Sequence, residues 1–417
     1  MEVPRYDQST NGFSFGLTLI HSAPFRPFEI STLPTSTNLL HVSLETVEDE
    51  TSNRPFQLVF ATTADRRLNL VAPNPVFTLF KSNNHLHDSP ILSYAVIGKR
   101  FLTTVSTSMS GQVILYDHKE DRVIEERRDH KKYAVKVTTW NGGSENRFTW
   151  IATAGWDAKV FIYRYTYITD AKPPGLGEPL GVLTLPTNPE TIIFIKHPES
   201  SDPILLVTRR DSTSLHFYAL PVSGSPPPAE LRLLGSQNLA PHSNAWIAFS
   251  PSSVAVCPTD PTLLAIATSA IPHLKLIIVR LLYPSLHLPT SNFPEPATQE
   301  AQTRAKLAIQ DKEETAIQIH ISTLAPQTAY STPQVFWRPD GSGVWVNGDD
   351  GVLRGIEAKT GKIIATLNNG HEVGSKIRSI WAGLVDIGGT KEEWLISGGF
   401  DKRLVIWKPE KEDDTVP

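Results

Sequence analysis

A strand–turn–strand pattern that occurs twice, far apart in the chain, is the feature that most constrains the fold. Residues 151–155 read Ile-Ala-Thr-Ala-Gly, residues 156–159 read Trp-Asp-Ala-Lys, and residues 160–163 read Val-Phe-Ile-Tyr. Apolar, β-branched and aromatic residues on both sides of a short polar turn indicate a β-hairpin. The same pattern returns at residues 394–407. A hairpin that recurs hundreds of residues later predicts a repeat architecture.

The pattern, traced along the chain, predicts seven units of three or four strands. Their approximate bounds are 37–81, 85–128, 129–185, 190–236, 244–325, 332–367 and 370–408. The last unit lacks a fourth strand of its own, whereas residues 14–20 alternate like a strand that has no hairpin partner. We expect that N-terminal strand to complete the last unit, because a repeat ring must join its ends or leave an open sheet edge.

The predicted fold class is therefore all-β, a single closed seven-bladed β-propeller of four-stranded blades covering residues 14–408. Residues 409–417 form a charged C-terminal tail. The fifth unit carries a polar insertion at 284–315, whose second half is rich in Ala, Gln, Lys and Glu. That composition fits either a short helix, which would cover the rim or bind a partner, or a disordered loop.

Composition excludes some classes of protein and places the chain inside the cell. The formal net charge of −4 gives no general attraction to nucleic acid, so we expect no direct contact with it. A single cysteine, Cys257, excludes an internal disulfide and indicates a reducing compartment. The most apolar run, 274–282, is interrupted by Lys275 and Arg280 and is too short to span a membrane. We expect a protein of the cytoplasm or the nucleus, without a signal peptide or membrane segment.

Three units share a spaced set of polar and aromatic residues, in which Ser or Thr lies four residues before the turn position and an aromatic residue six after it. The seventh unit has Gly370, His371, Ser397, Asp401 and Trp407. The third has His130, Thr153, Asp157 and Tyr163, and the second has His87, Ser106, Ser110 and Tyr116. With these residues the chain resembles the WD40 repeat family. The resemblance implies a buried hydrogen-bond network in each blade, with Tyr replacing Trp in two blades and Ser110 replacing the turn Asp in one.

The histidines and aspartates of these sets also invite a catalytic or metal-binding interpretation. They occur as one set per unit, so they are too far apart to converge on a single substrate. No nucleophile–base cluster or phosphate-binding loop accompanies them. One cysteine excludes thiolate clusters, and the pair His85 and His87 has no third ligand nearby. We therefore expect no enzymatic activity, no cofactor and no metal site.

The resemblance places candidate partner contacts just before each turn, on the top surface where WD40 propellers often dock proteins. These positions are Ala64, Met109, Trp156, Arg210, Asp349 and Phe400. Trp, Phe, Met and Arg are enriched in interface hot spots, although each ring would serve equally well to pack on a neighbouring blade. The charge run 125–132 lies at the same rim and adds Arg127 and Lys131 as contacts, unless it is simply a solvated face.

The predicted function is a non-enzymatic scaffold, a monomeric propeller that docks a partner peptide or domain on its top face within a multiprotein complex. One alternative is a substrate receptor of a ubiquitin ligase or a subunit of a chromatin or RNA-processing complex. Another is a propeller enzyme or small-ligand binder that uses the central channel, and a third is a propeller that binds nucleic acid. Titratable residues converging on the channel mouth would favour ligand binding in the channel.

Overall fold

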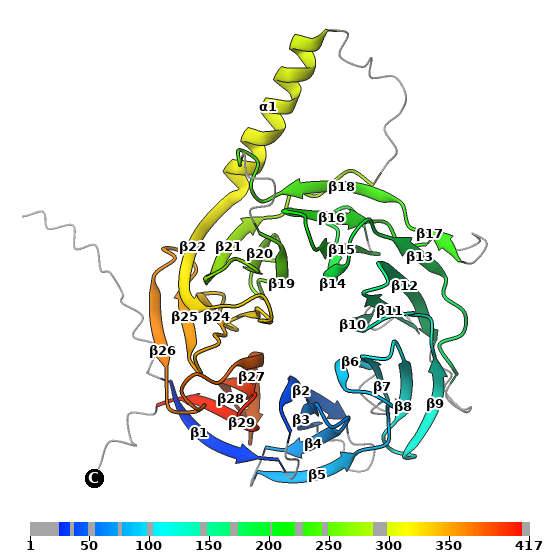
Figure 1. Ribbon diagram of the computed structural model, residues 1–417, viewed down its shortest axis with the longest axis vertical. Helices are drawn as coiled ribbons and strands as arrows, with labels where there is room; N and C mark the ends of the chain where they lie inside the picture. Colours follow the sequence, from blue (N-terminus) through cyan, green and yellow to red (C-terminus); the bar gives the residue numbers. More distant parts are fainter. Residues whose placement is uncertain are drawn as a thin grey trace, which may run out of the picture.

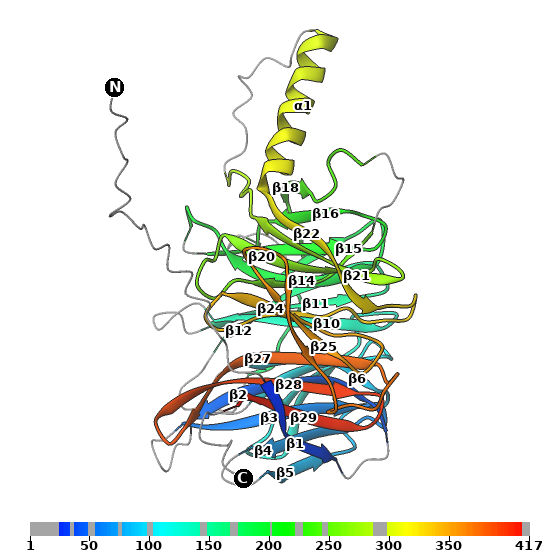
Figure 2. The same cartoon turned by 90° about the vertical axis from the view of Figure 1, so that its left-hand side faces the viewer.

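Seven antiparallel sheets stand around a common centre in the computed structural model of the chain (Figure 1). Seen from the side, the sheets form a disc from which one helix projects (Figure 2). The structure describes residues 25–33, 37–48, 55–73, 77–97, 103–141, 148–166, 174–200, 202–221, 228–243, 249–286 and 298–410.

Blades one to three follow one another along the chain, each with its first strand innermost. Blade one consists of β2 (Leu39–Glu48), β3 (Pro55–Thr63), β4 (Leu68–Ala72) and β5 (Thr78–Asn83). Blade two consists of β6 (Ile91–Ile97), β7 (Thr103–Ser108), β8 (Val113–Asp117) and β9 (Arg122–Arg127). Blade three consists of β10 (Ala134–Asn141), β11 (Phe148–Gly155), β12 (Lys159–Thr166) and β13 (Gly181–Thr184).

The remaining blades continue in the same order around the ring. Blade four consists of β14 (Pro189–Lys196), β15 (Pro203–Arg209), β16 (Ser214–Tyr218) and β18 (Leu233–Asn238). Blade five consists of β19 (Pro251–Val256), β20 (Leu263–Thr268), β21 (His273–Arg280) and β22 (Ile317–Pro326). Blade six consists of β23 (Val335–Trp337), β24 (Gly343–Val346), β25 (Leu353–Glu357) and β26 (Ile363–Leu367). Blade seven contains β27 (Ile377–Ile387), β28 (Thr390–Gly399) and β29 (Arg403–Pro409).

The ring is closed by a strand from the N-terminal end of the chain. Strand β1 (Phe25–Thr32) pairs antiparallel with β29, from Phe25 opposite Pro409 to Thr32 opposite Arg403 (Figure 1). The prediction of a seven-bladed propeller closed by an N-terminal strand is confirmed. The strand proposed from the sequence, 14–20, lies outside the described residues, and the observed closing strand begins at Phe25.

The hydrophobic core lies between neighbouring blades. The second and third strands are buried almost throughout, as in β7 and β8, because both of their faces are covered by other blades. Each interface has its own apolar cluster. The cluster between blades six and seven contains Trp345 and Trp407, and the cluster between blades seven and one joins Trp394 to Leu39. Since burial depends on contact between blades, the ring folds as one domain.

Two additions interrupt the regular pattern. Strand β17 (Ala229–Glu230), which precedes the last strand of blade four, pairs parallel with β13 and adds a fifth strand to blade three. Helix α1 (Gln299–Ala316) enters blade five just before β22. Thr298 caps it by accepting the N–H of Ala301, and the Glu313 carboxylate accepts the N–H of Asn238 at 2.7 Å. The 284–315 insertion therefore includes a helix, which projects from the ring instead of covering it (Figure 1).

Candidate functional site

A repeated backbone hydrogen bond marks one end of the ring. The N–H of Trp156 donates to the carbonyl of Tyr133 at 2.8 Å, and the N–H of Phe400 donates to that of Lys376 at 2.9 Å. The equivalent bond in blade five joins Ser269 to Ser250, a position that the sequence did not reveal. We call this end the top face; the residues that make the bond are Ala64, Met109, Trp156, Arg210, Ser269 and Phe400. In blade six the N–H of Asp349 donates instead to the carbonyl of Pro326, the last residue of β22 in blade five.

The inner strands bring a second set of residues to the same end. Strands β2, β6, β10, β14, β19 and β27 each have a register irregularity near their first residue. A β-bulge re-aims side chains and is common beside functional sites. The bulged residues are Leu40, Leu92, Val135, Glu190, Ser252 and Arg378. All of them line one central cavity.

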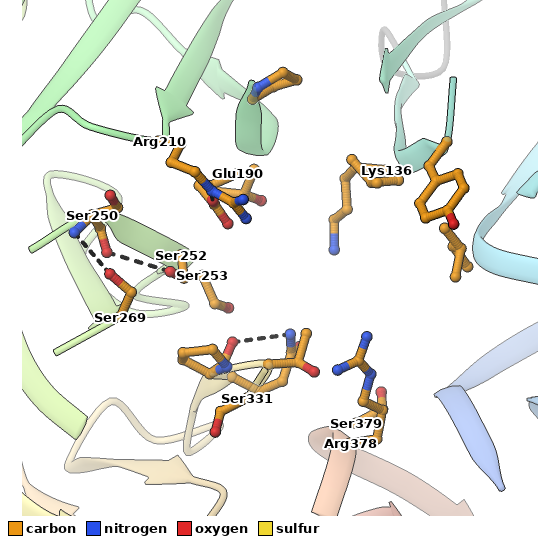
Figure 3. Close-up of a pocket in the computed structure, with 18 of the residues that line it drawn as sticks. Lys136, Glu190, Arg210, Ser250, Ser252, Ser253, Ser269, Ser331, Arg378 and Ser379 are labelled. Carbon is orange, nitrogen blue, oxygen red and sulfur yellow. Dashed lines mark hydrogen bonds and ion pairs between the residues drawn. The ribbon is translucent and has the colours of Figure 1, made fainter. Parts of the chain in front are cut away.

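That cavity has a volume of about 730 Å3 and takes its lining from all seven blades. Apolar side chains such as Leu92, Phe249 and Ile271 contribute to the wall, together with a group of serines. Figure 3 shows Ser250, Ser252, Ser253 and Ser269 on one side of the space, with Lys136 and Arg378 reaching into it from others. The volume lies within the range of pockets that hold drug-sized ligands.

A stacked aromatic and basic group stands at the mouth of the cavity. The rings of Tyr133 and Trp156 are stacked with centroids 5.0 Å apart, and the guanidinium of Arg210 lies 5.4 Å from the Trp156 ring centroid. Arg210 Nε also donates to Glu190 Oε1 at 2.7 Å. Burial raises the pKa of Glu190, and the interaction with Arg210 opposes that effect. Trp156 is half-buried and Tyr133 is 38% exposed, so this group forms part of the surface.

Two further cations face the cavity from blades three and seven. Lys136 and Arg378 are both half-buried, and burial lowers the pKa of each. His41 is a neighbour of Lys136. Its pKa is lowered to about 3, mainly by burial and to a smaller extent by the charge of Lys136, so this histidine is neutral near pH 7. In the part of the chain that the structure describes, neither cation has a hydrogen-bonded acceptor or an ion-pair partner.

The predicted top-face contacts differ in how available they are. Trp156, Met109 and Arg210 line the cavity, whereas Phe400 is half-buried beside it, with the Arg378 guanidinium 6.0 Å from its ring centroid. Asp349 is already engaged: its carboxylate lies 2.8 Å from Lys376 Nζ and accepts a hydrogen bond from Ser331. The side chain of Asp349 is only 11% exposed, so it offers little to a partner.

The charge run 125–132 was expected to offer Arg127 and Lys131 to a partner, and the two residues differ in how exposed they are. The guanidinium of Arg127 pairs with Asp129 at 2.7 Å, Glu125 at 3.1 Å and Glu178 at 3.2 Å. Its side chain is 14% exposed. Arg127 thus holds the rim together and is not an open contact, whereas Lys131 is exposed and uses its backbone N–H to donate to Asp157.

Blade seven contains the full buried network that the resemblance described above implies. His371 Nδ1 is 3.0 Å from the Asp401 carboxylate, and His371 Nε2 is 2.8 Å from Ser397 Oγ. Trp407 Nε1 donates to the same Ser397 oxygen at 2.8 Å. Gly399 leaves room for this contact, because a Cβ there would collide with the His371 ring and the Asp401 carboxylate. Every polar side chain of this set has a partner, so the network stabilises the blade.

Blade three has the same arrangement up to its aromatic residue. His130 is 3.0 Å from both Asp157 and Thr153. Tyr163 is fully buried, but its hydroxyl donates to Asp129 at 2.7 Å, which differs from the Trp407 contact in blade seven. The aromatic position is therefore retained in packing, while its hydrogen bond goes to the residue before the histidine.

Blade two departs further from the expected network. His87 Nε2 is 2.8 Å from Ser106 Oγ, but Ser110 donates to Asp88 at 2.5 Å and does not reach the histidine. Nδ1 of His87 makes no hydrogen bond within the described residues. Tyr116 donates to Asp121 and also stays outside the set. The placement of Ser110 and Tyr116 in the network was wrong, because a serine hydroxyl is too short to span the distance that an Asp carboxylate covers.

The sequence missed the cavity residues Tyr133, Lys136, Glu190 and Arg378. A usable signal did exist for Lys136 and Arg378, since each is a cation near the start of the first strand of its blade, β10 and β27. Among the described residues, no group of three or more His, Cys, Asp or Glu side chains is arranged to hold a metal ion. Among those same residues, no helix has the length and apolar character needed to cross a membrane.

Comparison with known proteins gives one family. The model of a family described as "UCP007778, beta-propeller domain" matches residues 57–408, which covers the chain from the second strand of blade one to the last strand of blade seven. No curated protein matched the sequence.

Proposed function

Since the chain belongs to this β-propeller family, we propose that it works as a non-enzymatic interaction scaffold that docks a partner segment on its top face within a multiprotein complex. The ring would hold the docking residues in fixed positions, because the inner strands and turns that carry them are bonded to one another at the top face. An intracellular location is part of the proposal and rests on the single cysteine, Cys257, which is free and buried.

The observation that carries the proposal is the Tyr133–Trp156–Arg210 group at the mouth of the central cavity. Aromatic and Arg side chains that are partly exposed around a pocket are typical of interface hot spots. Apolar side chains nearby are also uncovered: Ile271 is 60% exposed and Tyr330 is 86% exposed. Exposed apolar surface gathered around one pocket favours a partner that covers it.

We also propose that the propeller is a divergent member of the WD40 repeat family. The complete His371–Asp401–Ser397–Trp407 network and its close copy in blade three support this assignment. Blade two retains only the His87–Ser106 contact, which fits divergence of individual blades within one ring.

The test compares partner capture by the tagged full chain with capture by Trp156→Ala and by Trp156→Ala combined with Phe400→Ala. Purification from the native cell with quantitative mass spectrometry should show that the double variant loses its specific partners and that Trp156→Ala loses most of them. We expect the melting temperature to stay near that of the wild type, because neither ring is in the buried core.

A matched control is Phe80→Ala. Phe80 is 62% exposed on β5, the outermost strand of blade one. The substitution therefore removes an exposed ring that lies away from the cavity. This variant should capture partners as the wild type does. Capture that survives the double variant, or a loss that follows a fall in melting temperature, would overturn docking at this face.

A further inference from the structure

The central cavity holds two basic side chains that form no ion pair with any described residue. Lys136 comes from β10 and Arg378 from β27, and both side chains extend into the open space (Figure 3). Arg210 is different, because its guanidinium is 2.7 Å from the Glu190 carboxylate. The other carboxylate of the lining, Asp211, is exposed to solvent. Within the described lining, no carboxylate pairs with Lys136 or Arg378.

In three other blades the residue equivalent to Lys136 is a serine that bonds to the next blade. The residue that follows the inner-strand bulge is Ser93 in blade two, Ser253 in blade five and Ser379 in blade seven. Each of these hydroxyls accepts an N–H from the inner strand of the next blade, from Val137, Val335 and Val42 at 3.2, 3.4 and 3.0 Å. Lys136 occupies this position in blade three and makes no such bond among the described residues.

Charges held in this way carry a cost in stability. An ammonium or guanidinium group that loses water without forming an ion pair is destabilised. Burial lowers the pKa of Lys136 and of Arg378, and at Arg378 the charge of Asp349 opposes part of that effect. The Asp349 carboxylate forms its ion pair with Lys376, at 2.8 Å. The neighbouring His41 is neutral and gives no compensation. Unpaired, partly buried charges that converge on a cavity are typical of a binding site whose ligand supplies the opposite charge.

We propose that the cavity receives a carboxylate between Lys136 and Arg378, and that this carboxylate is an acidic side chain of the docked partner segment. The inference rests on the proposed docking function and names the chemistry that it recognises. Arg378 suits a two-point contact with a planar carboxylate, and Lys136 supplies a point charge from a different blade. The cavity volume of about 730 Å3 and the apolar wall formed by Leu92, Phe249 and Ile271 also accommodate the peptide that presents it.

The anion site is tested first with citrate, a small carboxylate probe, by isothermal titration calorimetry at low salt. Wild-type protein should bind citrate, and Lys136→Gln and Arg378→Gln should each bind about tenfold more weakly, as expected for the loss of one charge-assisted contact. Lys136→Arg should stay within about threefold of the wild type because it keeps the charge. Lys359→Gln is the matched control, since Lys359 is exposed in the turn between β25 and β26, at the end of the blade opposite the top face.

The source of the carboxylate is tested with two capped peptides, Gly-Phe-Glu-Phe-Gly and Gly-Phe-Gln-Phe-Gly. The wild type should prefer the Glu peptide by about fivefold or more, and Lys136→Gln should lose that preference. If the wild type binds citrate but does not prefer the Glu peptide, the ligand of the site is a free anion and not a side chain of the partner. Equal citrate binding by the wild type and Lys136→Gln would overturn the site itself.

Melting temperatures and partner capture distinguish a failure of the carboxylate site from a failure of folding or of docking. Lys136→Gln should melt at or above the wild-type temperature, because it removes an uncompensated charge. A citrate site that behaves as expected while Trp156→Ala still captures partners would defeat the docking proposal and leave the anion site standing. If capture depends on Trp156 but citrate binding does not depend on Lys136, the carboxylate site is wrong and the docking face stands.

Discussion

Blades seven and two carry His and Ser at the same spacing, yet their polar interiors differ. In blade seven, His371 lies between Asp401 and Ser397, and Trp407 completes the set. In blade two, the corresponding histidine forms a hydrogen bond with Ser106, and its second ring nitrogen is buried without a hydrogen-bond partner among the described residues. One difference in the turn, Asp in blade seven and Ser in blade two, accounts for the change.

The turn carboxylate of blade seven accepts hydrogen bonds from both the histidine and the backbone. Asp401 accepts from His371 and also from the backbone N–H of Glu372 at 2.9 Å. In blade two the backbone bond is retained by another residue, since Gln112 Oε1 accepts the N–H of Asp88 at 3.1 Å. The loop is therefore held in both blades, but the histidine is fixed at both nitrogens only where the Asp is present.

The largest expected effect is the loss of that carboxylate. Asp401→Ala should lower the free energy of unfolding by about 3 kcal/mol, because it leaves a fully buried histidine and two backbone N–H groups without their acceptor. Ser110→Ala in blade two should cost roughly 0.5 kcal/mol, since Ser110 is half-exposed and does not contact His87. Denaturant titration of both variants gives the comparison, and equal losses would show that the two turns are energetically alike.

An intermediate effect is expected in the pH dependence of the two blades. Burial lowers the pKa of His87 to about 4, against a smaller opposing effect of the Gln112 amide. Between pH 6.5 and 4 the unfolded chain takes up a proton that the folded chain does not, so the contribution of His87 is lost as the pH falls through this window. The stability difference between the wild type and His87→Gln should change in this window and be flat above it.

Blade seven should respond at lower pH. Burial would raise the pKa of Asp401, but the hydrogen bond and charge of His371 and the N–H groups of Glu372 and Arg403 hold it below its usual value. Its contribution is present above about pH 4 and is lost as the pH falls through the lowered pKa. The difference between the wild type and Asp401→Asn should be flat from pH 7 to 5 and shrink below about 4. A change that begins near pH 6 would contradict this assignment.

A smaller effect than the loss of Asp401 is expected from restoring the missing acceptor in blade two. Ser110→Asn adds an amide oxygen at the position that the carboxylate occupies in blades three and seven, where it should accept the Nδ1–H of His87. One new buried hydrogen bond should raise the free energy of unfolding by about 1 kcal/mol, measured by denaturant titration. Ser110→Ala serves as the control for losing the Asp88 contact, and an Asn variant no more stable than this control would show that the new oxygen does not bond to His87.

The networks of blades three and seven were predictable because most of their members lie in one hairpin. Thr153 and Asp157, like Ser397 and Asp401, are four residues apart around one tight turn, so the sequence spacing sets their geometry. The surroundings of Arg127 follow only in part from the local sequence. Asp129 and Glu125 are two residues away, whereas Glu178 is 51 residues away and is brought to Arg127 by packing between blades.

The sequence by itself determined the repeat, the number of blades and the polar sets that hold blades three and seven together. These depend on hairpins, whose strand periods and turn residues are local properties. Tertiary structure alone decided that Lys136 and Arg378 share one cavity and that β1, beginning at Phe25, closes the ring. Which side chains face the centre depends on bulges in the inner strands and on seven blades meeting around one axis, and this convergence exists only after the ring has closed.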